Sequence, residues 1–158
     1  MALSSHESPV ANTTSWLTPP WIVKSLGKFD LDPCGCEGSP FVNAETVYYK
    51  DGLEREWFGR VFLNPPYGRE IGDWMKRMSE HRNGTALIFA RTDTKFWHDY
   101  IWPYAHAILF LKGRLHFHYP NGERAKANAG APSVLISYSL QDTIRLHTCN
   151  IEGKLVEL

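Results

Sequence analysis

The sequence lacks several features that would place it in a large class of proteins. It has no apolar run near the roughly 18 residues that a membrane-spanning helix needs, and no charged-then-apolar signal at its N-terminus. Its three cysteines are an odd number, which excludes a fully paired disulfide framework. The spacing of Cys34, Cys36 and Cys149 does not predict a metal site. These absences favour a soluble, cytoplasmic protein.

An excess of charge is also missing. The 17 basic and 17 acidic residues cancel, whereas proteins that bind nucleic acid without specificity usually carry a clear positive charge. Any nucleic-acid surface must therefore be a local patch. By contrast, 43% hydrophobic and 13% aromatic residues predict a folded globular protein. We expect a flexible N-terminal arm over residues 1–15, which are rich in Ser, Thr and Asn, and a single domain over residues 16–158.

Residues 61–68, Val-Phe-Leu-Asn-Pro-Pro-Tyr-Gly, combine a buried strand with a rigid corner. The apolar run is typical of the end of a strand, and the two prolines stop it because neither carries a backbone N–H. The first proline also holds Asn64 in an extended conformation. In open α/β sheets ligands bind at this end of the strands, where the Asn64 amide, the prolyl carbonyls and the Tyr67 ring can face one small space. A plain turn whose tyrosine covers the core is the alternative.

The Asn-Pro-Pro-Tyr run resembles the Asn/Asp/Ser-Pro-Pro-Tyr/Phe signature of S-adenosylmethionine-dependent methyltransferases that modify amino nitrogens, most of them adenine N6. The resemblance implies a catalytic group made of Asn64, Pro65, Pro66 and Tyr67, with Asn64 also contacting the cofactor. The Asn64 side-chain oxygen and the Pro65 carbonyl would accept the two amino hydrogens and direct the nitrogen lone pair at the methyl group. Tyr67 would stack on an adenine flipped out of the duplex.

A helix is predicted just upstream, beginning within the Trp-Leu-Thr-Pro-Pro run of residues 16–20. Thr18 suits its N-cap, Pro19 suits its first position and Gly27 ends it. The Thr-Pro-Pro start resembles the segment that contacts the methionine end of the cofactor in amino-methyltransferases of the gamma order. This resemblance implies cofactor contacts from Trp16, Thr18 and Pro19, with the N–H groups of the helix start near the cofactor carboxylate. A well-capped helix without a ligand is the alternative.

The next segment, residues 29–41, predicts a short strand followed by a glycine-containing turn. It resembles the cofactor loop of the same enzymes in the form Asp/Glu-Pro-x-Cys/Gly-x-x-Gly-x-Phe. The implied cofactor contacts are Asp32, Pro33, Cys34 and Gly35. Asp32 is the candidate partner of the cofactor's ammonium group. Acids that merely cap a turn are the alternative.

The cofactor half of the chain is short for a methyltransferase. A full doubly wound enzyme places two strands and two helices between the cofactor loop and the catalytic corner. Here residues 33–63, 31 in number, have room for one strand over 46–49 and a short helix over 53–58.

The resemblance also implies that Asp51 bonds the cofactor's adenine amino group, with the apolar Leu53 close behind it. An Asp-Gly turn explains Asp51 equally well. No acid clearly matches the residue that holds the cofactor ribose in these enzymes, and Glu45 is the nearest option.

Further helices are predicted after Gly68 and after Asp93, which would cap the second one, and each carries an apolar stripe for the core. The stripes are Ile71, Trp74, Met75 and Met78 in the first helix and Phe96, Trp97, Tyr100 and Ile101 in the second. The expected buried strands cover residues 85–90, 107–111 and 132–138. The last two strands would pair with each other. Residues 139–158 would add an edge strand at 144–148 or remain extended.

Residues 112–126 are the candidate for a local basic patch. They carry four Lys or Arg side chains against one acid, with two histidines and two aromatic rings interleaved, as a nucleic-acid groove needs. The Gly-Arg-x-x-Phe stretch within them resembles one in adenine methyltransferases and implies that Phe117 packs on the flipped base opposite the tyrosine. The candidate DNA contacts are Tyr67, Arg69, Arg91, Lys95, Arg114, Phe117, Arg124 and Lys126.

Over roughly residues 16–138 the chain most resembles the small phage-type DNA N6-adenine methyltransferases. The resemblance implies an α/β fold, a reduced Rossmann-like methyltransferase sheet with helices on both faces and a closing antiparallel hairpin. It also implies S-adenosylmethionine as cofactor, DNA as partner and the cytoplasm of a bacterial host, in the setting of DNA modification or restriction-modification. Methylation of RNA adenine or of a protein glutamine amide, or DNA binding with a decayed site, remain alternatives.

Overall fold

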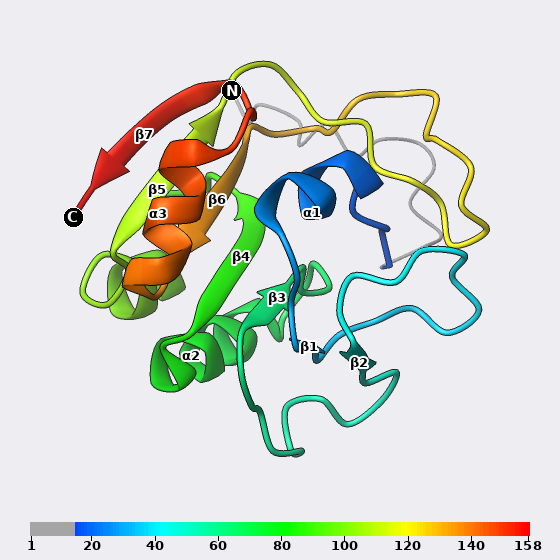
Figure 1. Cartoon of the computed structure of the whole chain (residues 1–158), viewed down its shortest axis with the longest axis horizontal. Helices are drawn as coiled ribbons and strands as arrows, with labels where there is room; N and C mark the ends of the chain where they lie inside the picture. Colours follow the sequence, from blue (N-terminus) through cyan, green and yellow to red (C-terminus); the bar gives the residue numbers. More distant parts are fainter. Residues whose placement is uncertain (1–14) are drawn as a thin grey trace, which may run out of the picture.

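A seven-stranded sheet lies at the centre of the computed structural model, which describes residues 15–158 (Figure 1). The strands are β1 (Leu31–Asp32), β2 (Thr46–Val47), β3 (Val61–Leu63), β4 (Gly84–Phe89), β5 (Ala107–Leu111), β6 (Ser133–Ser137) and β7 (Gly153–Glu157). The helices are α1 (Pro20–Leu26), α2 (Ile71–His81), α3 (Leu140–Thr148) and the π-helical turn η1 (Trp97–Ile101). The predicted α/β class is confirmed. The predicted N-terminal arm lies, except for Ser15, outside the described residues.

The strands follow the order β2-β1-β3-β4-β6-β5-β7. Strands β2, β1, β3 and β4 run parallel, so their carboxyl ends meet at one edge of the sheet. Strand β6 lies antiparallel between β4 and β5, which confirms the predicted pairing, and Leu109 faces Leu135 across it. Strand β7 extends this side of the sheet antiparallel to β5.

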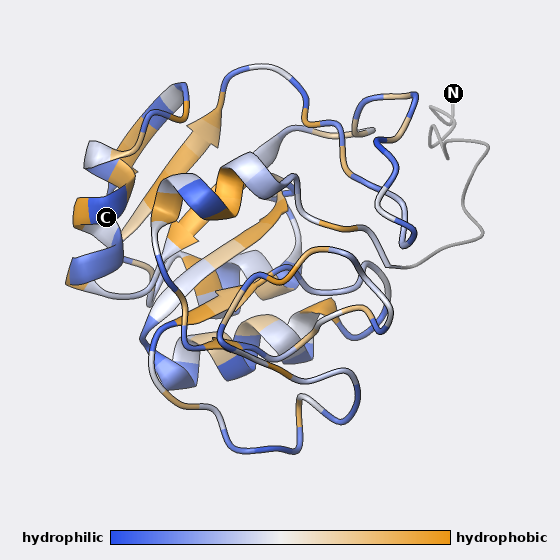
Figure 2. Cartoon of the chain, turned by 45° about the vertical axis from the view of Figure 1, so that its right-hand side comes forward, coloured by the Kyte–Doolittle hydropathy of each residue, from blue (hydrophilic) through white to orange (hydrophobic). Residues whose placement is uncertain are grey.

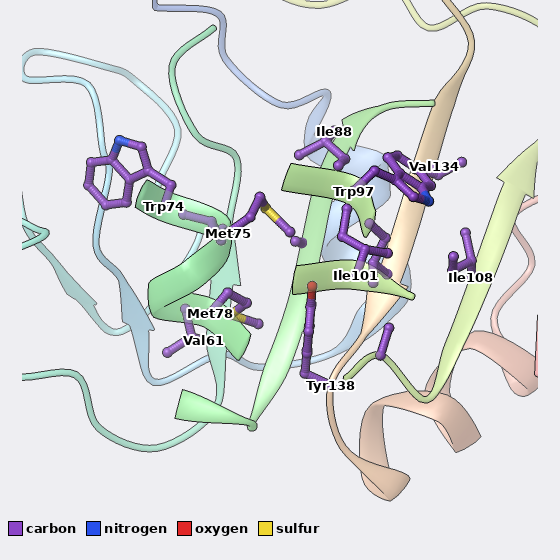
Figure 3. Close-up of a cluster of buried hydrophobic side chains, with 14 of the residues drawn as sticks. Val61, Trp74, Met75, Met78, Ile88, Trp97, Ile101, Ile108, Val134 and Tyr138 are labelled. Carbon is purple, nitrogen blue, oxygen red and sulfur yellow. The ribbon is translucent and has the colours of Figure 1, made fainter. Parts of the chain in front are cut away.

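Helices cover both faces of the sheet, and its central strands are therefore buried on both sides. In β4, Ala86 and Ile88 pack with α2 and η1, whereas Leu87 packs on the opposite face with α1 and α3. Figure 3 shows the first of these clusters, in which Met75, Met78 and Trp97 meet residues of the central strands. Hydrophobic residues accordingly concentrate on the strands in Figure 2. Among residues 15–158, no helix is long and apolar enough to cross a membrane.

The C-terminal segment corrects one prediction. Residues 144–148 do not form an edge strand but belong to α3, and the edge strand is β7, further along the chain. Ser139 caps α3, because its hydroxyl oxygen accepts a hydrogen bond from the Asp142 backbone N–H at 3.1 Å. Thr143 and Leu146 are buried against the rest of the protein.

Residues 53–58 correct a second prediction, since they form a turn and an extended segment in place of a helix. Asp51 starts the turn with a positive φ of 58°. The indole N–H of Trp57 then donates to the Gly52 carbonyl at 2.7 Å, and the Tyr48 hydroxyl donates to the Glu56 carbonyl at 2.8 Å. These bonds hold the backbone out of helical register. Between β1 and β3 the chain therefore contributes one short strand, β2, and no helix.

The predicted helix starts also need correction. Helix α1 begins at Pro20, one residue later than predicted, and Thr18 does not cap it. Pro19 and Pro20 have no N–H groups and the Ile22 N–H bonds the Pro19 carbonyl at 3.0 Å, so this start offers few donors to a ligand. No side chain caps η1, and Asp93 is exposed before it.

Candidate active site

A cleft lies at the edge of the sheet where β1, β2 and β3 end. It is lined by Ser15, Trp16, Leu17, Thr18, Asp32, Cys34, Gly35, Cys36, Ser39, Phe41, Asn43, Val47, Tyr49, Asn64, Pro65, Pro66 and Tyr67. The parallel pairing of the three strands explains this gathering, because segments distant in sequence leave the sheet side by side. The cleft thus unites the helix-start segment, the glycine-containing turn and the Pro-Pro corner.

The Asn64 side chain is held in one orientation at the wall of this cleft. Its amide nitrogen donates to the Trp16 carbonyl and to the Thr18 hydroxyl oxygen, both at 3.0 Å. A backbone carbonyl can only accept a hydrogen bond, so the amide nitrogen and not the oxygen must face Trp16. Within residues 15–158 no hydrogen bond is made to the Asn64 side-chain oxygen. This oxygen is therefore available to accept a hydrogen bond from another donor.

The Tyr67 ring is stacked on the Phe89 ring from the end of β4, with centroids 4.3 Å apart and planes 7° from parallel. Its hydroxyl group is buried and has no hydrogen-bond partner in the described part of the chain. Burial raises the pKa of the Tyr67 hydroxyl far above its usual range, although nearby Arg91 opposes this shift. The hydroxyl therefore stays protonated, and the ring provides an aromatic surface rather than a base.

Asp32 is the buried acid of the cleft, with 4% of its surface exposed. One carboxylate oxygen accepts the Cys34 backbone N–H at 3.0 Å, and the other accepts the Asn43 amide at 3.2 Å. Burial raises the pKa of Asp32 from 3.8 to about 6, while these two hydrogen bonds act in the opposite direction. Both partners are neutral, so the negative charge of Asp32 has no counter-ion among residues 15–158.

The turn after β1 needs a glycine because another strand passes close to it. The backbone N–H of Gly35 donates to the Tyr48 carbonyl at 2.9 Å, and a Cβ at position 35 would lie 2.1 Å from the Val47 Cγ1 atom. Only glycine allows this approach. The neighbouring Cys34 is half-buried, and burial is the largest cause that raises the pKa of its thiol far above the usual range. The thiol is therefore not activated as a nucleophile.

Not all predicted cofactor residues reach the cleft. Those that line it are Trp16, Thr18, Asp32, Cys34, Gly35 and Asn64, whereas Pro19, Pro33, Asp51 and Leu53 do not. Asp51 is exposed, and its backbone carbonyl accepts the N–H groups of Glu54 and Arg55, as the turn alternative predicts. The sequence interpretation missed Phe41, Asn43 and Tyr49. Tyr49 could have been found, because it lies two residues after the end of β2, at the ligand-binding edge.

The predicted DNA contacts other than the two aromatic residues are exposed. These are Arg69, Arg91, Lys95, Arg114, Arg124 and Lys126. Lys95 is paired with Asp99 on the same helical segment, and the guanidinium of Arg114 donates to the Ala129 carbonyl at 3.2 Å. The guanidinium of Arg91 lies 5.8 Å from the centre of the Phe89 ring, beside the tyrosine stack.

Phe117 is buried beside the tyrosine stack, and its predicted packing on a flipped base stays a prediction. Only 4% of its surface is exposed, and its ring meets Phe89 edge-on with a centroid distance of 6.2 Å. Phe89 is thus in ring contact with both Phe117 and Tyr67. The sequence interpretation did not single out Phe89, because it ends the apolar run of β4 and nothing in the sequence distinguished it from a core residue.

Comparison with known proteins supplies the family. Residues 5–152 match the family DNA N-6-adenine-methyltransferase (Dam). The chain belongs to this Dam family. No curated protein and no solved structure matches the chain. Dam membership implies methylation of adenine N6 in DNA. Groups of three or more side chains placed to bind a metal are absent from residues 15–158.

Proposed function

We propose that this Dam-family protein transfers a methyl group from S-adenosylmethionine to the N6 amino group of an adenine flipped out of DNA. The observation that carries the proposal is the fixed orientation of Asn64, whose free side-chain oxygen stands at the carboxyl end of β3 in the same cleft as a buried carboxylate. An acceptor for an amino group and an anion for a cationic cofactor are thus close together.

The cleft residues fit this cofactor. Asp32 is a buried anion with neutral partners only, and the ammonium group of S-adenosylmethionine would supply its missing counter-ion. The rings of Phe41 and Tyr49 line the same cleft and offer apolar surface to the cofactor's adenine. Once bound, the cofactor supplies an electrophilic methyl group on a sulfonium centre.

The protein's part in the reaction is positioning. The Asn64 oxygen and the Pro65 carbonyl accept the two hydrogens of the target amine, which draws the nitrogen towards tetrahedral geometry and directs its lone pair at the methyl carbon. The Tyr67 ring stacks on the target base and offsets part of the few kcal/mol that base flipping costs. Water can take the proton lost by the product, so no buried general base is required.

The sheet topology supports a reduced Rossmann-like methyltransferase fold over residues 16–158. The parallel half of the sheet holds the cleft at its carboxyl edge, and the reversed strand β6 forms an antiparallel hairpin with β5. The single short strand between β1 and β3 accounts for the small size of the cofactor half.

The test is transfer of labelled methyl from S-adenosylmethionine to DNA that lacks adenine methylation, followed by nucleoside analysis. RNA and a glutamine-containing protein extract serve as parallel acceptors. The proposal requires the label to appear as N6-methyldeoxyadenosine. Label confined to RNA or to protein amides would contradict the DNA assignment. Failure to bind S-adenosylmethionine by calorimetry would contradict the whole proposal and favour a DNA-binding protein with a decayed site.

A further inference from the structure

We infer that Thr18, together with the backbone carbonyl of Trp16, is a positioning element for Asn64 and not mainly a contact for the cofactor. The inference rests on the proposed function, in which the Asn64 side-chain oxygen accepts a hydrogen of the target amine. Its basis is the pair of hydrogen bonds, each 3.0 Å long, that the Asn64 amide nitrogen donates to these two groups.

A side-chain amide can adopt two orientations that differ by a half-turn and exchange its nitrogen and oxygen. Only one of them is satisfied here, because the reversed orientation would place the Asn64 oxygen against the Trp16 carbonyl oxygen. Thr18 has 1% of its surface exposed, so water does not readily replace its hydroxyl as the second acceptor. The Trp16 carbonyl thus selects the orientation that presents the oxygen to a substrate, and the Thr18 hydroxyl anchors the amide nitrogen in that orientation.

The segment that carries these acceptors is itself held in place by the basic segment of residues 112–126. Leu17 exchanges two backbone hydrogen bonds with His118, at 2.9 and 3.0 Å. The rings of Trp16 and Tyr119 also lie 5.5 Å apart at an angle of 37°. A chain of contacts therefore leads from the predicted DNA-binding segment through residues 16–18 to the catalytic amide.

Two possible roles of Thr18 can be distinguished by enzyme kinetics. A cofactor contact affects mainly the KM for S-adenosylmethionine, whereas a group that orients Asn64 affects the rate of transfer from the fully bound complex. Thr18→Val keeps the side-chain shape and removes the acceptor, while Thr18→Ser keeps the acceptor. Thr143→Val is the matched control, because Thr143 is a buried threonine of α3 whose hydroxyl bonds the Ser137 hydroxyl at 2.7 Å.

The experiment measures kcat and the KM for S-adenosylmethionine of these three variants on unmethylated DNA. Loss of one hydrogen bond predicts a kcat about 3- to 10-fold lower for Thr18→Val, with a smaller change in KM. Thr18→Ser should restore most of the wild-type kcat, and Thr143→Val should keep it. An unchanged kcat for Thr18→Val, or a raised KM alone, would overturn the inference.

A second measurement keeps the inference testable apart from the activity. The side-chain amide resonances of Asn64 are assigned by NMR in protein labelled with ¹⁵N-asparagine, with Asn64→Ala as the reference that lacks them. Thr18→Val should move these resonances and Thr18→Ser should return them close to the wild-type positions. Resonances that do not move in Thr18→Val would refute the positioning role even if the enzyme's substrate proved to be something other than DNA.

Discussion

The negative charge of the buried Asp32 carboxylate lowers the stability of the folded protein. Its pKa in the folded protein is about 6, above the ordinary 3.8, so folding favours the protonated form. Its contribution is neutral below pH 4 and becomes increasingly unfavourable as the pH rises from 4 to 6. Above that range the cost is about 3 kcal/mol, from 1.36 kcal/mol for each pKa unit. A buried charge with this cost is typical of a functional site.

Asp32→Asn should therefore raise the free energy of unfolding at pH 7.5 by up to about 3 kcal/mol, and by much less near pH 4.5. Urea denaturation at the two pH values measures the difference. Glu37→Gln, a change at an exposed acid on the adjoining turn, is the control and should have little effect at either pH. An Asp32→Asn protein that is less stable at pH 7.5 would refute this account of the carboxylate.

The same residue predicts a pH dependence of cofactor binding. If the Asp32 carboxylate pairs with the cofactor ammonium group, the Kd for S-adenosylmethionine should increase about tenfold for each pH unit below 6 and change little near pH 7, where the carboxylate and the ammonium group are both charged. Calorimetric titrations between pH 5 and pH 8 measure this profile. The Asp32→Asn protein should bind weakly at every pH. A wild-type Kd that did not change between pH 5 and pH 8 would argue against the pairing.

At the scale of elements, a buried ion pair connects the N-terminal ends of β3 and β4 with α3. The Arg60 guanidinium contacts one oxygen of Asp142 at 2.8 Å, and the hydroxyls of Thr85 and Ser139 donate to the same carboxylate at 2.7 and 2.6 Å. Arg60 is 5% exposed and Asp142 is fully buried. Removal of one partner leaves an unpaired charge in the interior.

Arg60→Met should lower the free energy of unfolding by about 3–5 kcal/mol, because Asp142 would remain buried without its partner. Lys76→Met is the contrasting variant, since Lys76 and Glu80 form an exposed pair on α2 and should contribute less than about 1 kcal/mol. Chemical denaturation of both proteins measures the contrast. Equal losses of stability would refute the structural role of the buried pair.

The elements that could be predicted from the sequence are those whose pattern is unambiguous. The apolar runs of β3 and β4 and the stripe of α2 are buried as expected, because long runs and stripes have few alternative placements. Helix α3 was missed because its apolar residues Leu140 and Ile144 face solvent, 69% and 54% exposed. Its buried positions are mostly polar, such as Asp142, which no hydrophobic pattern reveals.

The residues of the candidate active site also fall into two groups, those that the sequence predicts and those that it does not. Asp32 ends β1, Asn64 directly follows β3 and Tyr67 comes three residues after Asn64, so their place at the carboxyl edge could be predicted from the chain order alone. Asn43 could not, because it reaches Asp32 through a loop whose path depends on tertiary packing. The Phe89 stack depends likewise on how two strands sit side by side.

At the scale of the whole molecule, a net charge of zero confines DNA attraction to local groups. Arg91 is exposed beside the Tyr67–Phe89 stack, next to the ring on which we propose that the flipped base stacks. Arg91→Gln should weaken DNA binding for all sequences and reduce the slope of log K against log salt by about 1. Binding titrations at several salt concentrations measure the slope. Arg145→Gln, a change at an exposed arginine of α3, should leave it unchanged.

The central claim, that the corner at residues 64–67 catalyses methyl transfer by positioning the amine, is tested most directly by one rate. This is the single-turnover rate of methyl transfer to DNA by Asn64→Ala, measured with cofactor and DNA both saturating. Loss of the acceptor that is aligned by Trp16 and Thr18 predicts a rate lower by about 10²- to 10³-fold, with the protein still folded. A rate within about threefold of wild type would contradict the account.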